Sequence, residues 1–136
     1  MSTVIEQLNN EGVQLFLRGK IGSAKEKYNL ALEKEPKHTT TLNNLGILAL
    51  QEKEYKKAIE FFKKAIEEKE HSTYFLNLGH VYANMNNQKL AEEAYHRSLD
   101  LNSKSIGAWK SLASLYQFQG RYRAVSYTHL TLPTIA

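Results

Sequence analysis

Cysteine is absent from this 136-residue sequence, and the absence removes several kinds of chemistry at once. Without a thiol the chain can form no disulfide, no thiolate metal site and no cysteine nucleophile. The remaining composition, 42% hydrophobic and 24% charged, is ordinary for a globular domain. The sequence therefore predicts a soluble fold that depends on neither cross-links nor thiolate-bound metal.

Long apolar runs are also missing. No stretch approaches the roughly 18 consecutive apolar residues that suggest a membrane span. A secretory signal has a basic segment followed by an apolar run. Residues 1–8 do not show this pattern. We therefore expect a cytoplasmic protein with no membrane partner.

Motifs that carry catalysis are lacking as well. The sequence has no glycine-rich phosphate loop, no zinc-type His-Glu pair at helical spacing and no nucleophile with a neighbouring base. His38 and His71 fall in corresponding loops, which suggests a metal site, but two histidines without a third ligand are weak support for one. The sequence thus predicts no enzyme activity within this chain, no cofactor and no metal.

The formal net charge of +4 raises the question of a nucleic-acid partner. Between residues 52 and 70, however, six lysines are interleaved with six glutamates. Mixed charges of this kind are typical of a solvated helix face rather than of a basic binding surface. We therefore expect no nucleic-acid partner.

The sequence repeats itself with a period near 34. Gly12, Gly46, Gly79 and Ala113 are separated by 34, 33 and 34 residues. The second half of each unit repeats in the same way, in the columns Ala24/Ala58/Ala91, Tyr28/Phe62/Tyr95 and Ala31/Ala65/Ser98. A period of this length is typical of stacked helix-turn-helix units.

These columns resemble the tetratricopeptide repeat, whose pattern is a large apolar residue, Leu-Gly, Tyr, then Ala, an aromatic residue, Ala and Pro. The third unit matches best, with Phe75, Leu78-Gly79, Tyr82, Ala91, Tyr95 and Ser98. The resemblance implies an all-α fold, a right-handed superhelical solenoid of helix pairs. It divides the chain into repeats at 5–38, 39–71 and 72–105 and a partial fourth repeat at 106–124.

Residues 125–136 break the pattern, because they drop the repeating columns and place Pro133 where a helix should continue. Val125 to Thr134 resembles a translated transposase adaptor from sequencing-library preparation. We interpret 125–136 as a non-native tail and the chain as the N-terminal piece of a longer protein. The competing interpretation is a divergent terminal helix.

The repeating small residues predict where paired helices cross. Gly12, Gly46 and Gly79 allow close approach at the crossings, and we expect the aromatic column to fill the gaps between repeats. Gly19 is expected to end the first helix in the left-handed conformation, after an N-cap at Ser2 or Thr3. The second unit is one residue short, and the missing residue is predicted in the loop near 68–72.

The first helix of each repeat carries a stripe of polar residues, offset from the residues that pack, and this stripe is the strongest candidate for a binding site. Asn10, Asn44 and Asn77 each precede the glycine column by two residues, and Ser111 holds that place in the fourth repeat. In the array that the sequence resembles, the first helices line a concave groove. We call these four residues the ladder. An Asn amide donates and accepts hydrogen bonds, so the ladder can bind a peptide backbone whatever the peptide's side chains are. The alternative is that these asparagines only support loops.

Two flanking columns complete the predicted groove. They are Asn9, Asn43, Leu76 and Lys110, one residue before the ladder, and Val13, Ile47, His80 and Ser114, three residues after it. The N-terminal half is the more apolar, so we expect an extended segment with one or two apolar side chains to bind there. His80 can make binding pH dependent if it contacts the ligand.

Three interpretations of function remain open. The first is a non-catalytic scaffold that binds a protein or peptide partner in the groove. The second is the substrate-recruiting arm of a larger enzyme or signalling protein, for example a glycosyltransferase with such repeats. The third is weak self-association through the uncapped fourth repeat, near Trp109, Tyr116 and Tyr122. A clamp for chaperone tails is disfavoured because Asn9, Thr73 and Asn77 stand at its basic positions.

Overall fold

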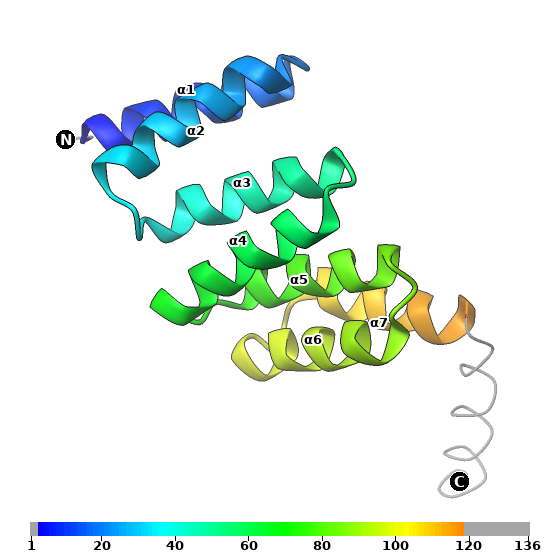
Figure 1. The fold of residues 1–136 in the computed structure, drawn as a ribbon. Helices are drawn as coiled ribbons and strands as arrows, with labels where there is room; N and C mark the ends of the chain where they lie inside the picture. The colour runs from blue at the N-terminus through cyan, green and yellow to red at the C-terminus, as the bar shows by residue number, and fades with distance from the viewer. Residues whose placement is uncertain (1–2, 119–136) are drawn as a thin grey trace, which may run out of the picture.

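Seven α-helices and no β-strand make up residues 3–118, which are the residues that the computed structural model describes (Figure 1). The predicted tail at 125–136 and residues 119–124 of the fourth repeat lie outside this range. The helices are α1 Val4–Leu17, α2 Ile21–Lys34, α3 Thr39–Gln51, α4 Tyr55–Glu68, α5 Ser72–Asn84, α6 Gln88–Leu101 and α7 Ile106–Phe118.

The helices form pairs, α1 with α2, α3 with α4 and α5 with α6, and α7 begins a fourth unit (Figure 1). Each pair turns through one residue with a positive φ, namely Gly19 at 79°, Lys53 at 62° and Asn86 at 62°. The prediction for Gly19 is confirmed, although α1 itself ends at Leu17. Glycine adopts this conformation without steric cost and asparagine tolerates it, so the turn at Lys53 carries the most backbone strain.

The first helix of each of the three complete repeats is capped by a side chain, as the sequence predicts for α1. Thr3 accepts a hydrogen bond from the Glu6 backbone at 3.1 Å, and Glu6 accepts one from the Thr3 backbone at 2.8 Å. Hydrogen bonds to the Glu6 carboxyl, first from the Thr3 backbone and then from the Thr3 side chain, lower its pKa. His38 and His71 cap α3 and α5 through Nδ1, which accepts from Thr41 N at 3.4 Å and Thr73 N at 3.1 Å.

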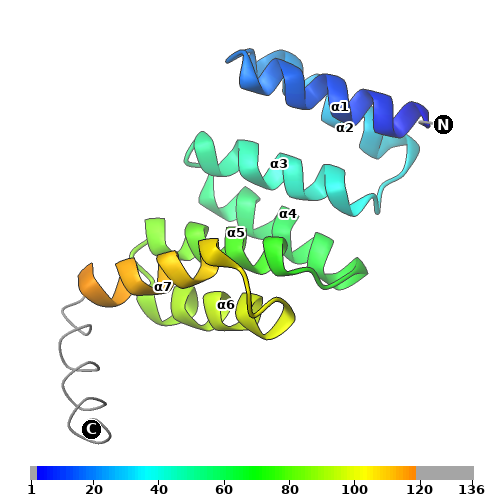
Figure 2. The same ribbon diagram turned by 180° about the vertical axis from the view of Figure 1, so that it is seen from behind.

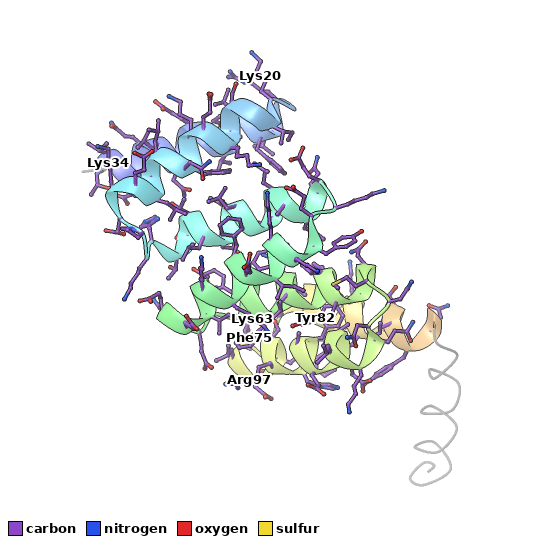
Figure 3. The ribbon with its side chains drawn as sticks, in the orientation of Figure 1. Lys20, Lys34, Lys63, Phe75, Tyr82 and Arg97 are labelled. Carbon is purple, nitrogen blue, oxygen red and sulfur yellow. The ribbon has the colours of Figure 1, made fainter. Side chains whose placement is uncertain are left out.

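The loop between the second and third repeats is short, as predicted. It comprises residues 69–71, whereas the loops at 35–38 and 102–105 are one residue longer. Arg97 of α6 ties this loop down, donating to both carboxylate oxygens of Glu70 at 3.1 and 2.9 Å. The same guanidinium lies 5.3 Å from the centre of the Phe75 ring (Figure 3).

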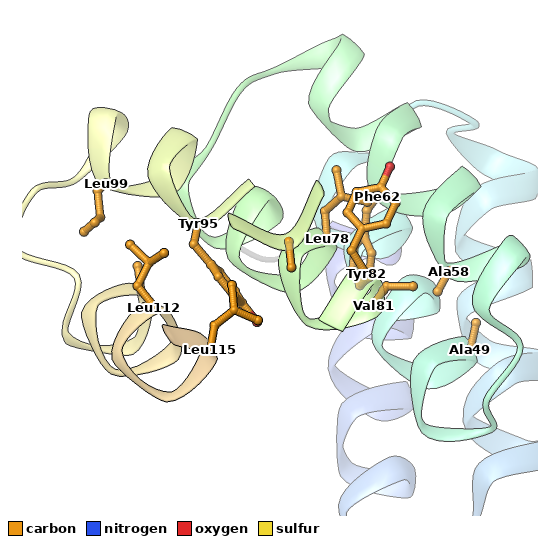
Figure 4. Packing of buried hydrophobic residues seen from close by; sticks show 12 residues of the cluster. Ala49, Ala58, Phe62, Leu78, Val81, Tyr82, Tyr95, Leu99, Leu112 and Leu115 are labelled. Carbon is orange, nitrogen blue, oxygen red and sulfur yellow. The ribbon is translucent and has the colours of Figure 1, made fainter. Parts of the chain in front are cut away.

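The glycine column lies where the paired helices cross, as predicted. A Cβ added at Gly46 or Gly79 would lie 2.5 Å from a ring carbon of Phe62 or Tyr95, its partner in the same repeat. The aromatic rings therefore pack inside their own repeat, and the prediction that they fill gaps between repeats is incomplete. Phe62 and Tyr95 do also join the hydrophobic cluster that runs on into α7 (Figure 4).

The solenoid has an inner and an outer side. Cα atoms of α1 and α3, α3 and α5, and α5 and α7 approach within 8 Å, whereas α2, α4 and α6 have no such approach to one another. Because the first helices are closer together than the second helices, the stack curves toward them. We call the surface lined by α1, α3, α5 and α7 the inner face (Figure 2).

Candidate functional site

The predicted ladder lies on the helices of the inner face. Asn10 is exposed, and Asn44, Asn77 and Ser111 are half-buried. The helical repeat places them at equivalent positions of α1, α3, α5 and α7. The structure thus brings the four residues onto one side of the solenoid, one on each first helix.

The asparagines bond to one another across the repeats. Asn44 Nδ2 donates to Asn9 Oδ1 at 3.0 Å, and Asn77 Nδ2 donates to Asn43 Oδ1 at 2.9 Å. The acceptors Asn9 and Asn43 are only 6% and 8% exposed, so they lie beneath the face rather than on it. We call these two hydrogen bonds the rungs, since each joins the first helices of adjacent repeats.

The first rung is part of a longer polar chain. Thr41, fully buried, donates to Asn9 Oδ1 at 3.2 Å, and its hydroxyl lies 2.7 Å from His38 Nδ1. Asn9 Oδ1 therefore accepts two hydrogen bonds, which compensates for its removal from water. Sequence reasoning missed Thr41, because its three-residue spacing from Asn44 is a weak signal beside Thr39 and Thr40.

The rungs leave half of each inner amide unused. Within residues 3–118, Oδ1 of Asn44 and of Asn77 accepts no hydrogen bond, and the Asn10 side chain forms none. Each is at least partly exposed. The inner face therefore presents amide groups at a spacing of one per repeat, held in place by the rungs.

The third junction has no rung, because Leu76 and Ser111 stand where the asparagines would be. Within the third repeat itself, the Tyr95 hydroxyl of α6 lies 3.0 Å from His80 Nδ1 of α5, with the two rings edge to face at 5.6 Å. Burial lowers the pKa of His80 and so favours the neutral ring. Burial raises the pKa of Tyr95, and a hydrogen bond from Ser111 lowers it in part.

The remaining predicted groove residues divide between core and surface. Val13 and Ile47 are half-buried and pack against hydrophobic clusters, the first with Tyr28 and Leu45, the second with Phe62. Lys110 and Ser114 are exposed on α7. That the N-terminal half of the groove accepts apolar side chains stays a prediction.

The described part of the chain shows neither a metal-binding cluster nor a membrane-spanning helix. No group of three or more His, Cys, Asp or Glu side chains is placed to hold a metal ion there. None of the helices among residues 3–118 combines the length and apolar character that crossing a bilayer requires.

Comparison with known proteins identifies the repeats. Residues 40–72 and residues 72–105 each match a family model described as tetratricopeptide repeat. Anaphase-promoting complex subunit 6 of Arabidopsis thaliana is 34% identical over 94 residues, which are 64% of this chain and 17% of that protein. The chain thus spans less than a fifth of this relative's length.

Solved structures share the fold. The tetratricopeptide-repeat domain of Sgt2 from Aspergillus fumigatus matches with a TM-score of 0.82 at 21% identity, over 91% of this chain and 83% of that one. The first such domain of Spaghetti (RPAP3), bound to an HSP90 peptide, matches with a TM-score of 0.80 at 18% identity, over 85% and 95%. The chain therefore has the all-α fold of a tetratricopeptide-repeat solenoid, and its residues 40–105 are tetratricopeptide repeats.

Proposed function

We propose that this chain is a non-catalytic interaction module that binds an extended peptide segment of another protein on its inner face. The observation that carries the proposal is the pair of rungs, which fix Asn44 and Asn77 while leaving Oδ1 of each without a partner within residues 3–118. An extended peptide carries backbone N–H groups that can donate to such acceptors. The similarity to a domain solved with a bound peptide supports this interpretation.

The inner face can bind in this way because its amides are already ordered. A side chain that is free in solution loses rotamer entropy when a ligand fixes it, at a cost of about 0.5–1.5 kcal/mol. Asn44 and Asn77 have been fixed by their bonds to Asn9 and Asn43 before any peptide arrives. The rungs thus reduce the entropy lost on binding.

The test separates binding from stability. Peptides are selected against the full chain from a random display library, and affinities of the best one are measured by fluorescence anisotropy for wild type, Asn10→Ala and the double variant Asn44→Ala/Asn77→Ala. We expect both variants to bind more weakly, the double variant by roughly tenfold or more for two lost hydrogen bonds.

Asn10→Ala is the informative single variant, since Asn10 is exposed and forms no hydrogen bond within residues 3–118. Its stability should equal that of wild type, so any loss of affinity reports on the peptide. Unchanged affinity in the double variant, with circular dichroism showing a folded chain, would remove the ladder from the binding site.

A second candidate function is that of a recruiting arm in a larger enzyme or signalling protein. The observation that favours it is the small share, 17%, of the Arabidopsis relative that the chain spans. Reading the uninterrupted coding sequence from the source DNA tests this candidate directly. A catalytic domain encoded in the same frame would support it, and a stop codon soon after the repeats would contradict it.

A further inference from the structure

The third repeat junction contains a hollow of about 430 Å³ between α5, α6 and α7. Four residues of the predicted groove line it, so it is continuous with the inner face; they are His80, Lys110, Ser111 and Ser114. Tyr95 lines it as well, and Asn86 and Gln88 extend the lining to the turn between α5 and α6.

The hollow exists because this junction lacks the apolar side chains of the other two. Phe16 and Leu50 are half-buried and pack on hydrophobic clusters, whereas Ala83 stands at the equivalent place in the third repeat. Ile21 and Tyr55 likewise pack on those clusters, and Gln88 replaces them. A small residue and a polar one therefore open space that larger apolar side chains occupy elsewhere.

The lining carries one charge, that of Lys110, and no acidic side chain. Lys110 is exposed and forms no ion pair within residues 3–118. By contrast, Lys27 pairs with Glu11 at 3.1 Å and Lys57 with Glu54 at 3.4 Å. The ammonium of Lys110 is therefore available to a ligand of opposite charge.

Neutral hydrogen-bonding groups line the same hollow as this cation. His80 Nδ1 is engaged by the Tyr95 hydroxyl, so Nε2 is the ring nitrogen left for a ligand. In the tautomer in which Tyr95 donates to Nδ1, Nε2 carries the proton and is a donor. The side-chain amides of Asn86 and Gln88 and the hydroxyl of Ser114 add further hydrogen-bonding groups to the lining.

We propose that this hollow is a subsite of the inner face that takes the carboxylate of an acidic side chain of the bound peptide. The inference rests on the proposed peptide-binding function and names one feature of the ligand. One cation among neutral donors matches a group with a single negative charge. A phosphate, with nearly two charges, is more often bound by clustered arginines, which the lining lacks.

The test uses the full chain and a selected peptide, re-synthesised with an acetylated N-terminus and an amidated C-terminus. We expect selection to enrich Asp or Glu at one peptide position. Changing that residue to its amide, or making Lys110→Gln, should each weaken binding about three- to tenfold, the range for a partly exposed charged contact. The two changes together should weaken it no more than either alone, since they remove the same interaction.

Matched variants make the result specific. Lys104→Gln removes an exposed lysine of the nearby 102–105 loop that is not part of the lining, and it should leave affinity unchanged. Ala83→Leu should fill the hollow and weaken the acidic peptide more than its amide form. Additive effects of Lys110→Gln and the peptide change, or no acidic enrichment, would overturn the subsite.

The remaining outcomes separate this inference from the proposed function. If peptides bind through Asn44 and Asn77 without an acidic preference, the groove stands and the subsite fails. If no peptide is selected, both fail. If a phosphoserine peptide binds more tightly than the acidic peptide and this binding depends on Lys110, the hollow takes a phosphate group instead of a carboxylate. Loss of binding on C-terminal amidation would assign the chain end rather than a side chain.

Discussion

The first two repeat junctions and the third use different side chains in the same positions. The first two are joined by Asn9–Asn44 and Asn43–Asn77 and filled by apolar residues. The third has no rung and contains a hollow, which is lined in part by the Tyr95–His80 pair of the third repeat. The comparison shows that one backbone arrangement accommodates either a stabilising contact or space for a ligand, depending on a few positions per repeat.

The largest expected difference between the junctions is in the stability lost when the side chain at the rung position is truncated. Asn9→Ala leaves Asn44 Nδ2 without its acceptor and takes one of two side-chain partners from the buried Thr41 hydroxyl, so the free energy of unfolding should fall by about 1–3 kcal/mol. Ser111→Ala, at the junction without a rung, should cost less than about 1 kcal/mol. Urea denaturation followed by circular dichroism measures both. Equal losses of unfolding free energy in the two variants would contradict the proposed difference between the junctions.

Filling the hollow should make the third junction resemble the second. Ala83→Leu places an apolar side chain where Leu50 stands one repeat earlier, and we expect a gain of about 0.5–1 kcal/mol. The control is Ala49→Leu, at a position only 3% exposed, which should lose about 1–3 kcal/mol from overpacking. Thermal denaturation of the two variants should shift in opposite directions.

The turns allow a finer comparison between repeats. Lys53 has a φ of 62° where the first repeat has Gly19 at 79°. Lys53→Gly should relieve this strain and stabilise the chain by about 0.5–1 kcal/mol, whereas Gly19→Ala should destabilise it by a similar amount. A stabilising effect of Gly19→Ala in urea denaturation would contradict this account.

The smallest effect concerns pH. Burial lowers the folded-state pKa of His80, so the folded chain binds fewer protons than the unfolded chain just below the ordinary value of 6.5. The contribution of His80 is therefore present above that pH and is lost as pH falls through the lowered pKa. Val13 and Ile47 hold its place in the other repeats and do not titrate. His80→Gln should reduce the loss of stability between pH 7.5 and pH 5, measured by denaturation at each pH.

Sequence periodicity predicted the features that depend on one helix pair. The glycine crossings, the Thr3 cap and the left-handed Gly19 follow from residue type and spacing within a repeat, and the short 69–71 loop follows from the one residue by which the second unit is shorter. The four ladder residues fall on α1, α3, α5 and α7 because the 3.6-residue period fixes which residues share a face, and their role in binding stays a prediction.

Features that depend on two repeats were not predictable in the same way. Spacing shows that Asn9 and Asn10 lie on neighbouring faces of α1, but not that Asn9 is buried against Asn44 of the next repeat. The hollow beside Ala83 likewise depends on how far the side chains of α7 reach across the junction. Distances between repeats are set by packing, which a single helical period does not contain.

The position of the rungs determines how the stack can bend. They join helices on the short side of the curve, while the backbones of α2, α4 and α6 remain apart on the long side. At the first two junctions, neighbouring repeats are thus joined by hydrogen bonds along the inner side of the curve. When α2, α4 and α6 move closer together or farther apart, the curvature of the stack therefore changes more than the distance between successive amide acceptors.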